Sequence, residues 1–423
     1  MNGLLNFLND SLTAYHAVEN TKKILLENGF SRLSEREDFE IHANGKYFIE
    51  RAGAALIAFT VGNLDNFAYK IAAAHLDSPC LKLKSEPLQK SSGCVTLNTE
   101  TYGGGVWHSY FDRPLKIAGR VVKCENGRVR SEVLTSPYAV VIPSLAIHQQ
   151  RTVNDGFAIN AQIDLQPLLS LDGQQNEWLD KITNGENATA YDLFVVNAQS
   201  PYTFGCNDEF IASPRIDNLT SAYAALQALL SHAESDGICV AALLNSEEIG
   251  NKTTTGADGN FMEMTLKRIA YALRFDDNEF YKALASSFLV SVDNAHAVHP
   301  NHPEKSDPTN KTLLGGGVVI KSHAGGAYIT DGVSNAVVTT ILDKAGVKHQ
   351  AFFNRSDVRS GTTLGVSALA KTSMAGADVG LAQLAMHSAC ECFCGSDYTE
   401  LVNGLTAFYS SNILADENGF IIE

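Results

Sequence analysis

Short, almost continuously apolar segments alternate with helical patterns in the second half of the chain, and this alternation constrains the fold most. Gly237 to Leu244 and Ser287 to Val292 have the character of buried strands. Leu219 to Ser235 and Val337 to Lys344 carry apolar residues at helical spacing. Strands that are apolar at successive positions are buried on both faces, as in parallel sheets covered by helices. The sequence therefore predicts an α/β fold with a mostly parallel sheet flanked by helices.

A segment of different character interrupts this pattern. Residues from about 91 to 204 are rich in β-branched residues and turn signals, and Asn126-Gly127 is a typical hairpin turn. We interpret this segment as an inserted β-rich domain. The predicted organisation is an α/β domain formed by residues 1–90 and 205–423, with the insertion at residues 91–204.

The charge balance argues against several classes of partner. The chain has 32 Lys and Arg against 47 Asp and Glu, a formal charge of -15, so phosphate backbones and anionic membranes would repel it. No apolar run reaches the length of a membrane span, and the first residues lack the features of a signal peptide. We therefore expect a cytoplasmic protein with neither nucleic acid nor membrane as partner.

Eight cysteines are scattered through the chain without a dense disulfide framework, which is typical of reduced thiols. Cys390, Cys392 and Cys394 raise the alternative of a zinc site. Their spacing at every second residue is poor for a shared ligand cage, so we interpret them as structural thiols.

Side chains that bind metals occur where the predicted strands end or a helix begins. They are His75, Asp77, Asp217, Glu247, Glu248, Asp293 and, towards the C-terminus, His387. Each alone has an ordinary explanation: a hydrogen-bonded histidine, a helix cap at Asp217, or a solvated pair of glutamates. Their coincidence favours a site, because ligands of open α/β sheets bind beyond the carboxyl ends of the strands.

This set of residues suits two divalent metal ions that share one carboxylate. The predicted ligands are His75 and Asp293 on one ion, Glu248 and His387 on the other, and Asp217 between them. Asp77 is predicted to orient the imidazole of His75. Glu247 is left without a metal in this allocation. It is the predicted general base, which takes a proton from the water that bridges the two metals. Zinc is the expected metal, with cobalt and manganese as alternatives.

With these residues in place, the chain resembles the M18 metallopeptidases, the aspartyl aminopeptidases, from end to end. The matching segments are Ala74–Lys82, Tyr102–His108, Phe111–Arg113, Pro143–His148, Pro214–Leu219, Glu247–Gly250, Ser291–Asn301, Gly315–Lys321 and Met386–Ser388. The resemblance implies a dinuclear-zinc exopeptidase-like fold and removal of N-terminal Asp or Glu from peptides.

The resemblance also implies roles that the residue pattern does not show. Lys321 would help to receive the acidic side chain of the substrate, and His148 would reach the active site of a neighbouring subunit. The insertion would make dimer contacts in a homo-oligomer, a tetrahedral dodecamer built from dimers. Two segments differ from the usual sequence of the family. Arg359-Ser360 replaces a Pro-Cys pair in the loop 357–365, and Gln149-Gln150-Arg151 follows His148 where the family often has Leu-Asp-Arg.

The sequence thus predicts a two-metal aminopeptidase that prefers N-terminal Asp or Glu. One alternative is a di-metal amidohydrolase or deacylase acting on small amides, because the same ligands serve any amide carbonyl; turnover of N-acyl amino acids without turnover of peptides would favour it. Another is a catalytically silent oligomeric shell or binding protein that has kept the fold. The presence of Glu247 beside all five predicted ligands argues against the silent protein.

Overall fold

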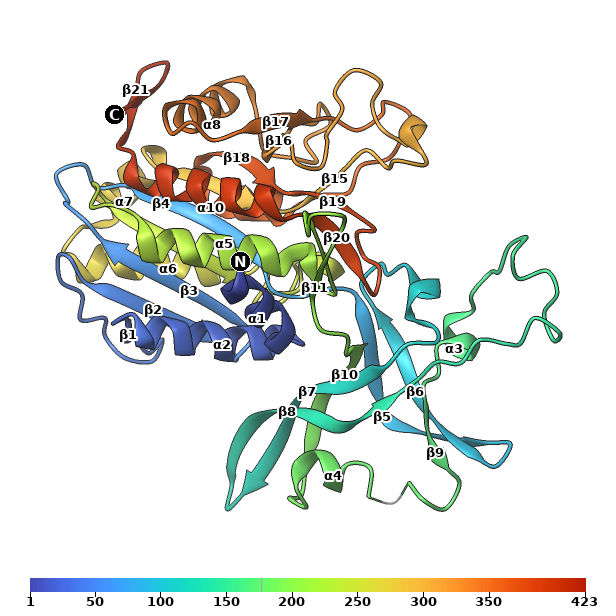
Figure 1. Cartoon of the computed structure of the whole chain (residues 1–423). Coiled ribbons are helices and arrows are strands. Elements are labelled where there is room, and N and C mark those ends of the chain that lie inside the picture. The colour runs from blue at the N-terminus through green and yellow to red at the C-terminus, as the bar shows by residue number, and fades with distance from the viewer. Residues whose placement is uncertain (176) are drawn as a thin grey trace.

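The computed structural model describes residues 1–175 and 177–423, and a large mixed sheet forms its centre (Figure 1). In spatial order, its strands within these residues are β1 (Ser31–Arg32), β2 (Lys46–Arg51), β3 (Ala55–Val61), β13 (Ile238–Leu244), β4 (Tyr69–His75), β14 (Phe288–Val292), β18 (Ala375–Gly380), β16 (Val318–Lys321) and β17 (His349–Phe352). The four central strands, from β13 to β18, are parallel. Antiparallel pairs join β2 to β3, β3 to β13 and β16 to β18. The prediction of an α/β fold with a mostly parallel sheet is confirmed.

Helices cover both faces of this sheet (Figure 1). One face packs against α1 (Asn2–Asp10), α2 (Ala14–Glu27), α5 (Ile216–Ser231), α8 (Gly332–Lys344) and α10 (Gly395–Ser410). The other face packs against α6 (Phe261–Ala272), α7 (Asp277–Ala285) and α9 (Leu364–Thr372). Because successive side chains of a strand point to opposite faces, β3 contributes Leu56 and Ala58 to the first core and Ile57 and Phe59 to the second.

A second, antiparallel sheet projects from one end of this layered body (Figure 1, lower right). Its order is β8 (Arg128–Val140), β7 (Leu115–Glu125), β10 (Ala190–Asn197), β5 (Cys80–Ser91), β6 (Cys94–Tyr102) and β9 (Leu168–Leu171). Asn126 and Gly127 connect β7 to β8 with positive φ at both residues, which is the predicted hairpin turn. The sheet has its own hydrophobic core, to which the short helix α4 (Asp180–Thr183) contributes Ile182. The short helix α3 (Ala161–Asp164) lies beside β6 and has no buried residue. The sheet starts at Cys80. Strand β5 therefore begins before the predicted insertion and ends at Ser91, the first residue of that insertion.

A third sheet gathers segments that are far apart in the sequence. It consists of β11 (Tyr202–Phe204), β12 (Phe210–Ser213), β20 (Glu391–Cys394), β19 (Ala382–Leu384) and β15 (Ala295–His296). The hairpin of β21 (Ile413–Asp416) and β22 (Gly419–Ile422) ends the chain, and η1 (Trp107–Tyr110), η2 (Glu247–Ile249) and η3 (Pro303–Lys305) are short 3-10 turns. Among the described residues, no helix is long and apolar enough to cross a membrane.

Candidate active site

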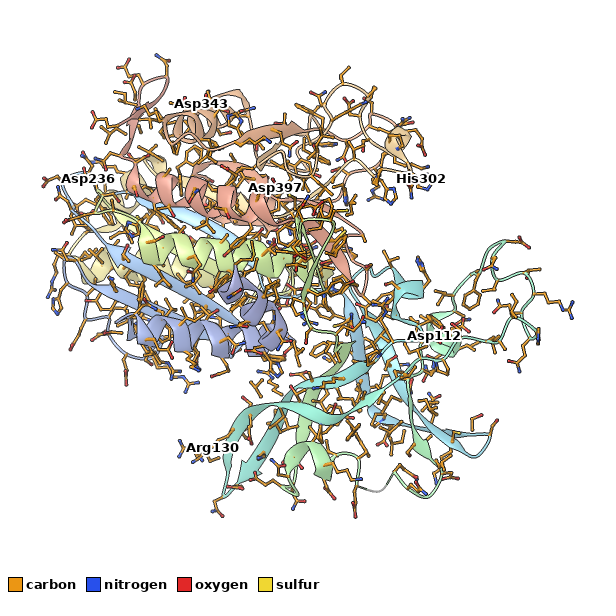
Figure 2. All side chains as sticks on the ribbon, viewed as in Figure 1. Asp112, Arg130, Asp236, His302, Asp343 and Asp397 are labelled. Carbon is orange, nitrogen blue, oxygen red and sulfur yellow. The ribbon has the colours of Figure 1, made fainter. Side chains whose placement is uncertain are left out.

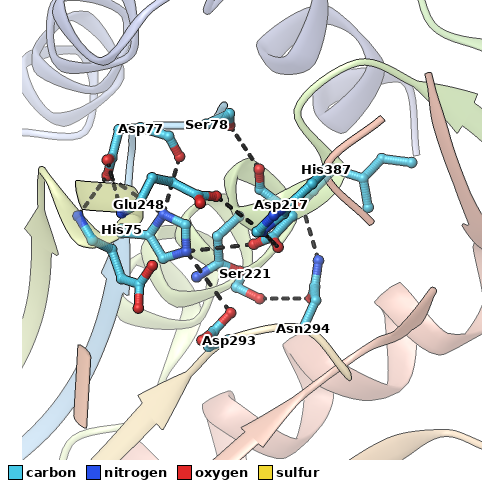
Figure 3. Close-up of polar contacts among 12 residues, drawn as sticks. His75, Asp77, Ser78, Asp217, Ser221, Glu248, Asp293, Asn294 and His387 are labelled. Carbon is cyan, nitrogen blue, oxygen red and sulfur yellow. Dashed lines mark hydrogen bonds and ion pairs between the residues drawn. The ribbon is translucent and has the colours of Figure 1, made fainter. Parts of the chain in front are cut away.

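Neighbouring strands of the large sheet bring the predicted site residues together. His75 is the last residue of β4, η2 with Glu247 and Glu248 follows β13, and Asp293 follows β14. Since β13, β4 and β14 are adjacent and parallel, their carboxyl ends meet at one edge of the sheet. Asp217 comes from the first turn of α5, and the close-up shows its carboxylate among the other side chains (Figure 3).

Asp217 lies between two groups of ligand atoms. On one side, His75 Nε2 is 3.4 Å from Asp217 Oδ1 and 3.8 Å from Asp293 Oδ1. On the other side, His387 Nε2 is 3.5 Å from Asp217 Oδ2 and 3.3 Å from Glu248 Oε1. In each group the three ligand atoms lie within 4.8 Å of one another. The two oxygens of Asp217 therefore face different groups, which is the arrangement that a bridging carboxylate needs.

The imidazole of His75 is held in the orientation that a metal ligand requires. Its Nδ1 lies 3.0 Å from the backbone carbonyl oxygen of Asp77, and a carbonyl oxygen only accepts, so Nδ1 is the donor. The lone pair is then on Nε2, which points at Asp217 and Asp293 (Figure 3).

Asp77 also positions both glutamates that follow β13. Its Oδ1 accepts the backbone N–H of Glu247 at 3.1 Å, and its Oδ2 accepts that of Glu248 at 3.2 Å. Ligand atoms of His75, Glu247 and Glu248 form a third group within 4.8 Å, so the carboxylate of Glu247 is next to the predicted metal ligands. The buried Asp77 is thus a positioning residue for the whole edge of the sheet.

The donor set fits two divalent cations. Asp217 Oδ1 and Glu248 Oε1 are buried and have no hydrogen-bond partner among the described residues, although a buried carboxylate oxygen without a partner is costly. Burial raises the pKa of Glu247 to about 8 and that of Glu248 well above its usual range, and Asp217 raises both further. Imidazole nitrogens and carboxylate oxygens are the ligands that zinc accepts, and cations between them would supply the missing partners.

Glu391 is a residue of the site that the sequence analysis missed. It is only 2% exposed and lies on β20. Its Oε2 accepts the backbone N–H of Asp217 at 2.9 Å, and its Oε1 accepts that of His387 at 2.7 Å. Burial raises the pKa of Glu391 to about 8, with the charge of Asp217 adding to the effect. One carboxylate thus fixes the backbone of two predicted ligands from different parts of the chain.

Glu391→Gln should weaken zinc binding by about 10- to 100-fold, the usual loss when a group that orients a ligand is changed. The amide keeps one acceptor but presents N–H donors to the other backbone N–H, which leaves a buried donor unpaired. Competition with a fluorescent chelator measures the affinity. Glu400→Gln is the matched control, since Glu400 accepts the backbone N–H of Lys348 away from the site. Equal zinc affinity in wild type and Glu391→Gln would contradict this role.

The structure separates the two residues expected to bind substrate. Lys321 ends β16 and lines the same cavity as His75, Asp217 and Glu247, with its Nζ 3.6 Å from Asp293 Oδ2. His148 lies on an exposed turn of the segment between β8 and α3 and does not line this cavity. The eight cysteines are free, and within residues 1–175 and 177–423 none belongs to a group that could hold a metal.

The second sheet reaches the site through the end of β6. The hydroxyl of Tyr102 donates to Asp77 Oδ2 at 2.9 Å. Two residues later, the carbonyl oxygen of Gly104 accepts a hydrogen bond from His387 Nδ1 at 2.9 Å. This contact leaves Nε2 of His387 free to face Asp217 and Glu248.

Histidines and carboxylates collected at the carboxyl ends of parallel strands, around a cavity of about 680 Å³, define a metal-dependent hydrolase site. Residues 7–409 match the model of the family described as aminopeptidase I zinc metalloprotease (M18). The chain belongs to the M18 family of aminopeptidases, which are zinc-dependent hydrolases of peptide bonds.

Known proteins resemble the chain over nearly its whole length. A probable M18 family aminopeptidase 2 of Clostridium acetobutylicum is 39% identical, covering 96% of this chain and 98% of that protein. The protein of the same name from Pseudomonas aeruginosa, strain UCBPP-PA14, is 36% identical, covering 97% and 98%. A cryo-EM structure of the Ape4 and Nbr1 complex matches with a TM-score of 0.92 at 30% identity, covering 97% of this chain and 85% of that chain. The M18 aminopeptidase of Thermotoga maritima matches with a TM-score of 0.84 at 26% identity, covering 96% and 95%.

Proposed function

We propose that this aminopeptidase uses two zinc ions per chain and prefers peptides that begin with Asp or Glu. The observation that carries the proposal is Asp217, whose two oxygens face two separate ligand groups with Glu247 beside them. In this proposal His75 and Asp293 hold one ion, Glu248 and His387 hold the other, and Asp217 joins them.

When bound, the zinc ions act as Lewis acids on the scissile carbonyl and lower the pKa of water. Glu247 takes the proton of the water that adds to the carbonyl carbon, and then gives this proton to the departing amine nitrogen as the C–N bond breaks. Asp77 keeps Glu247 in place through the backbone hydrogen bond to its N–H. Burial of Glu247 supports this role, because a desolvated carboxylate is a stronger base.

Lys321 is the proposed receptor for the acidic side chain of the substrate. Among the described residues that line the cavity, it is the cation in contact with a predicted metal ligand, through Asp293. An acidic side chain near Lys321 would therefore belong to the residue next to the scissile bond. The ring of Tyr328 lies 5.1 Å from Nζ and forms part of the same wall.

Lys321→Met should lower the ratio of kcat/KM for Asp-terminated over Leu-terminated peptides by about 10- to 100-fold, since a hydrogen bond to a charged group is worth about 1.5–3 kcal/mol. The ratio separates substrate recognition from any effect of the Asp293 contact on metal binding, which would lower both rates. Lys371→Met, at a surface pair with Asp258, is the matched control. An unchanged ratio would remove Lys321 from this role.

The remaining parts of the proposal concern assembly. A related structure is described as a dodecamer of mApe1 from S. cerevesiae, and it shares the fold of this chain. We propose that this chain also forms a homo-oligomer, with residues 91–204 as the dimerisation domain between catalytic parts 1–90 and 205–423. The exposed position of His148 on this domain suits contact with a neighbouring active site. Light scattering and complementation of His148→Ala subunits by Glu247→Gln subunits would test this, and fractionation would test the expected cytoplasmic location.

A further inference from the structure

The cavity beside the metal ligands carries a charge opposite to that of the chain as a whole. The charged residues that line it, among those the structure describes, are the acids Asp217, Glu247 and Asp293 and the cations Lys305, Lys321, Arg355 and Arg359. All three acids belong to the predicted metal site. Beyond that site the charged wall is entirely cationic within the described residues, although the chain has a net charge of -15.

Two of these four cations have an ion-pair partner within the protein. Lys321 faces Asp293 and donates to the backbone oxygen of Asn294 at 3.2 Å. Arg355 is paired with Asp357 by two hydrogen bonds of 2.9 and 2.8 Å. Lys305 and Arg359 differ, because neither side chain forms a salt bridge among residues 1–175 and 177–423 and both are exposed, although the charge of Lys305 acts on the nearby carboxylates of Glu304 and Asp357.

Contacts between loops place these two free cations on one wall. Arg355 Nη1 donates to the backbone oxygen of Glu304 at 2.6 Å, so the turn that contains Lys305 lies against the loop that contains Arg359. His302, at the start of this turn, is labelled in Figure 2 near the outer end of the molecule. Lys305 and Arg359 are both exposed, so they belong to the solvent-facing part of the cavity wall.

A chain of contacts orders this wall relative to the metal site. Lys321 contacts Asp293, the ring of Tyr328 lies next to Lys321, and the hydroxyl of Tyr328 accepts from Ser360 Oγ at 3.3 Å. Arg359 precedes Ser360, so its backbone lies close to these contacts, and its side chain lines the same cavity as Lys321. The residues that follow the substrate's first leave the metal site through the same cavity, and Lys305 and Arg359 are exposed cations of its wall.

We infer that Lys305 and Arg359 form a second acidic-residue subsite, selecting peptides with a further Asp or Glu at the second or third position. This inference rests on the proposed function, which places the first residue at Lys321. The substrate class becomes peptides with an acidic N-terminal segment rather than a single acidic first residue.

The test compares the amides of Asp-Ala-Ala, Asp-Asp-Ala, Asp-Ala-Asp and Leu-Ala-Ala with the zinc-loaded enzyme, measuring release of the first residue by mass spectrometry. We expect kcat/KM for the better diacidic peptide to exceed that for Asp-Ala-Ala by about 5-fold, the effect of a partly exposed ion pair, and to fall towards it as salt rises. In the double variant Lys305→Gln, Arg359→Gln the ratio should approach 1. The control Lys23→Gln, Arg36→Gln removes the same charge from exposed sites outside the cavity and should keep the wild-type ratio.

The outcomes separate this inference from the proposed function. Cleavage of Asp-Ala-Ala without preference for a second acid would overturn the subsite and leave the proposed function standing. A preference that survives in the Lys305, Arg359 double variant would overturn the assignment to these residues. If Leu-Ala-Ala-amide is cleaved and Asp-Ala-Ala-amide is not, the acidic first-residue preference fails, and the subsite that depends on it fails with it.

Discussion

Replacing Glu247 by Gln should lower kcat by about 10²- to 10⁴-fold while the zinc content of the protein stays at the wild-type value. The amide has nearly the shape of the carboxylate but cannot take a proton from water. Asp77 Oδ1 accepts the backbone N–H of residue 247, so the backbone contact survives the change. Initial rates on an Asp-terminated peptide, together with metal analysis of the same preparation, measure both quantities.

Glu263→Gln serves as the control for this substitution. Glu263 lies on α6, outside the groups of potential metal ligands. Wild-type turnover in Glu247→Gln would show that another group moves the proton. A parallel loss of zinc and activity would show instead that Glu247 is a metal ligand, which the third ligand group, with His75 and Glu248, makes a concrete alternative.

The second large effect is expected from Asp217→Asn. Only a carboxylate with two charged oxygens suits a bridge between two cations, and Asp217 presents one oxygen to each ligand group. We expect the variant to retain less than one zinc ion per chain, against two in the wild type, and to lose hydrolysis almost completely. Metal analysis after gel filtration counts the ions.

Thermal unfolding gives an independent measure of the same loss. A ligand that binds only the folded protein stabilises it by about 2.7 kcal/mol at 100 times its Kd, so a chelator should lower the Tm of the wild type and zinc should restore it. In Asp217→Asn both shifts should be much smaller. Asp416→Asn, on the exposed terminal hairpin, should behave like the wild type. Two zinc ions in Asp217→Asn would contradict the bridging role.

The sequence was sufficient to predict the edge of the sheet where the site lies. His75, Glu248 and Asp293 follow apolar strands, and the parallel arrangement of β4, β13 and β14 was enough to bring their ends together. The hairpin at Asn126 and Gly127 could also be predicted from neighbouring residues alone, because the turn depends on residues that tolerate positive φ.

Contacts between distant segments were beyond such reasoning. The third sheet pairs β12 with β20 and β15 with β19, and no local pattern specifies those partners. Glu391 was missed for the same reason, since it acts on backbone N–H groups of residues in two other segments. A signal was present nevertheless: Glu391 and Phe393 are the buried residues of the short strand β20, and a glutamate on the buried side of a strand needs a partner.

The hydrogen bonds from the end of β6 link metal binding to the second sheet. Tyr102 contacts Asp77, which holds His75, Glu247 and Glu248 in place, and Gly104 contacts His387. Displacement of this sheet would therefore disturb both of the proposed metal positions at once. If subunits associate through the sheet, linkage requires that metal binding strengthens their association by the same factor by which association strengthens metal binding. Zinc depletion would then weaken the association of subunits, and dilution of the protein, which separates subunits, would weaken zinc binding.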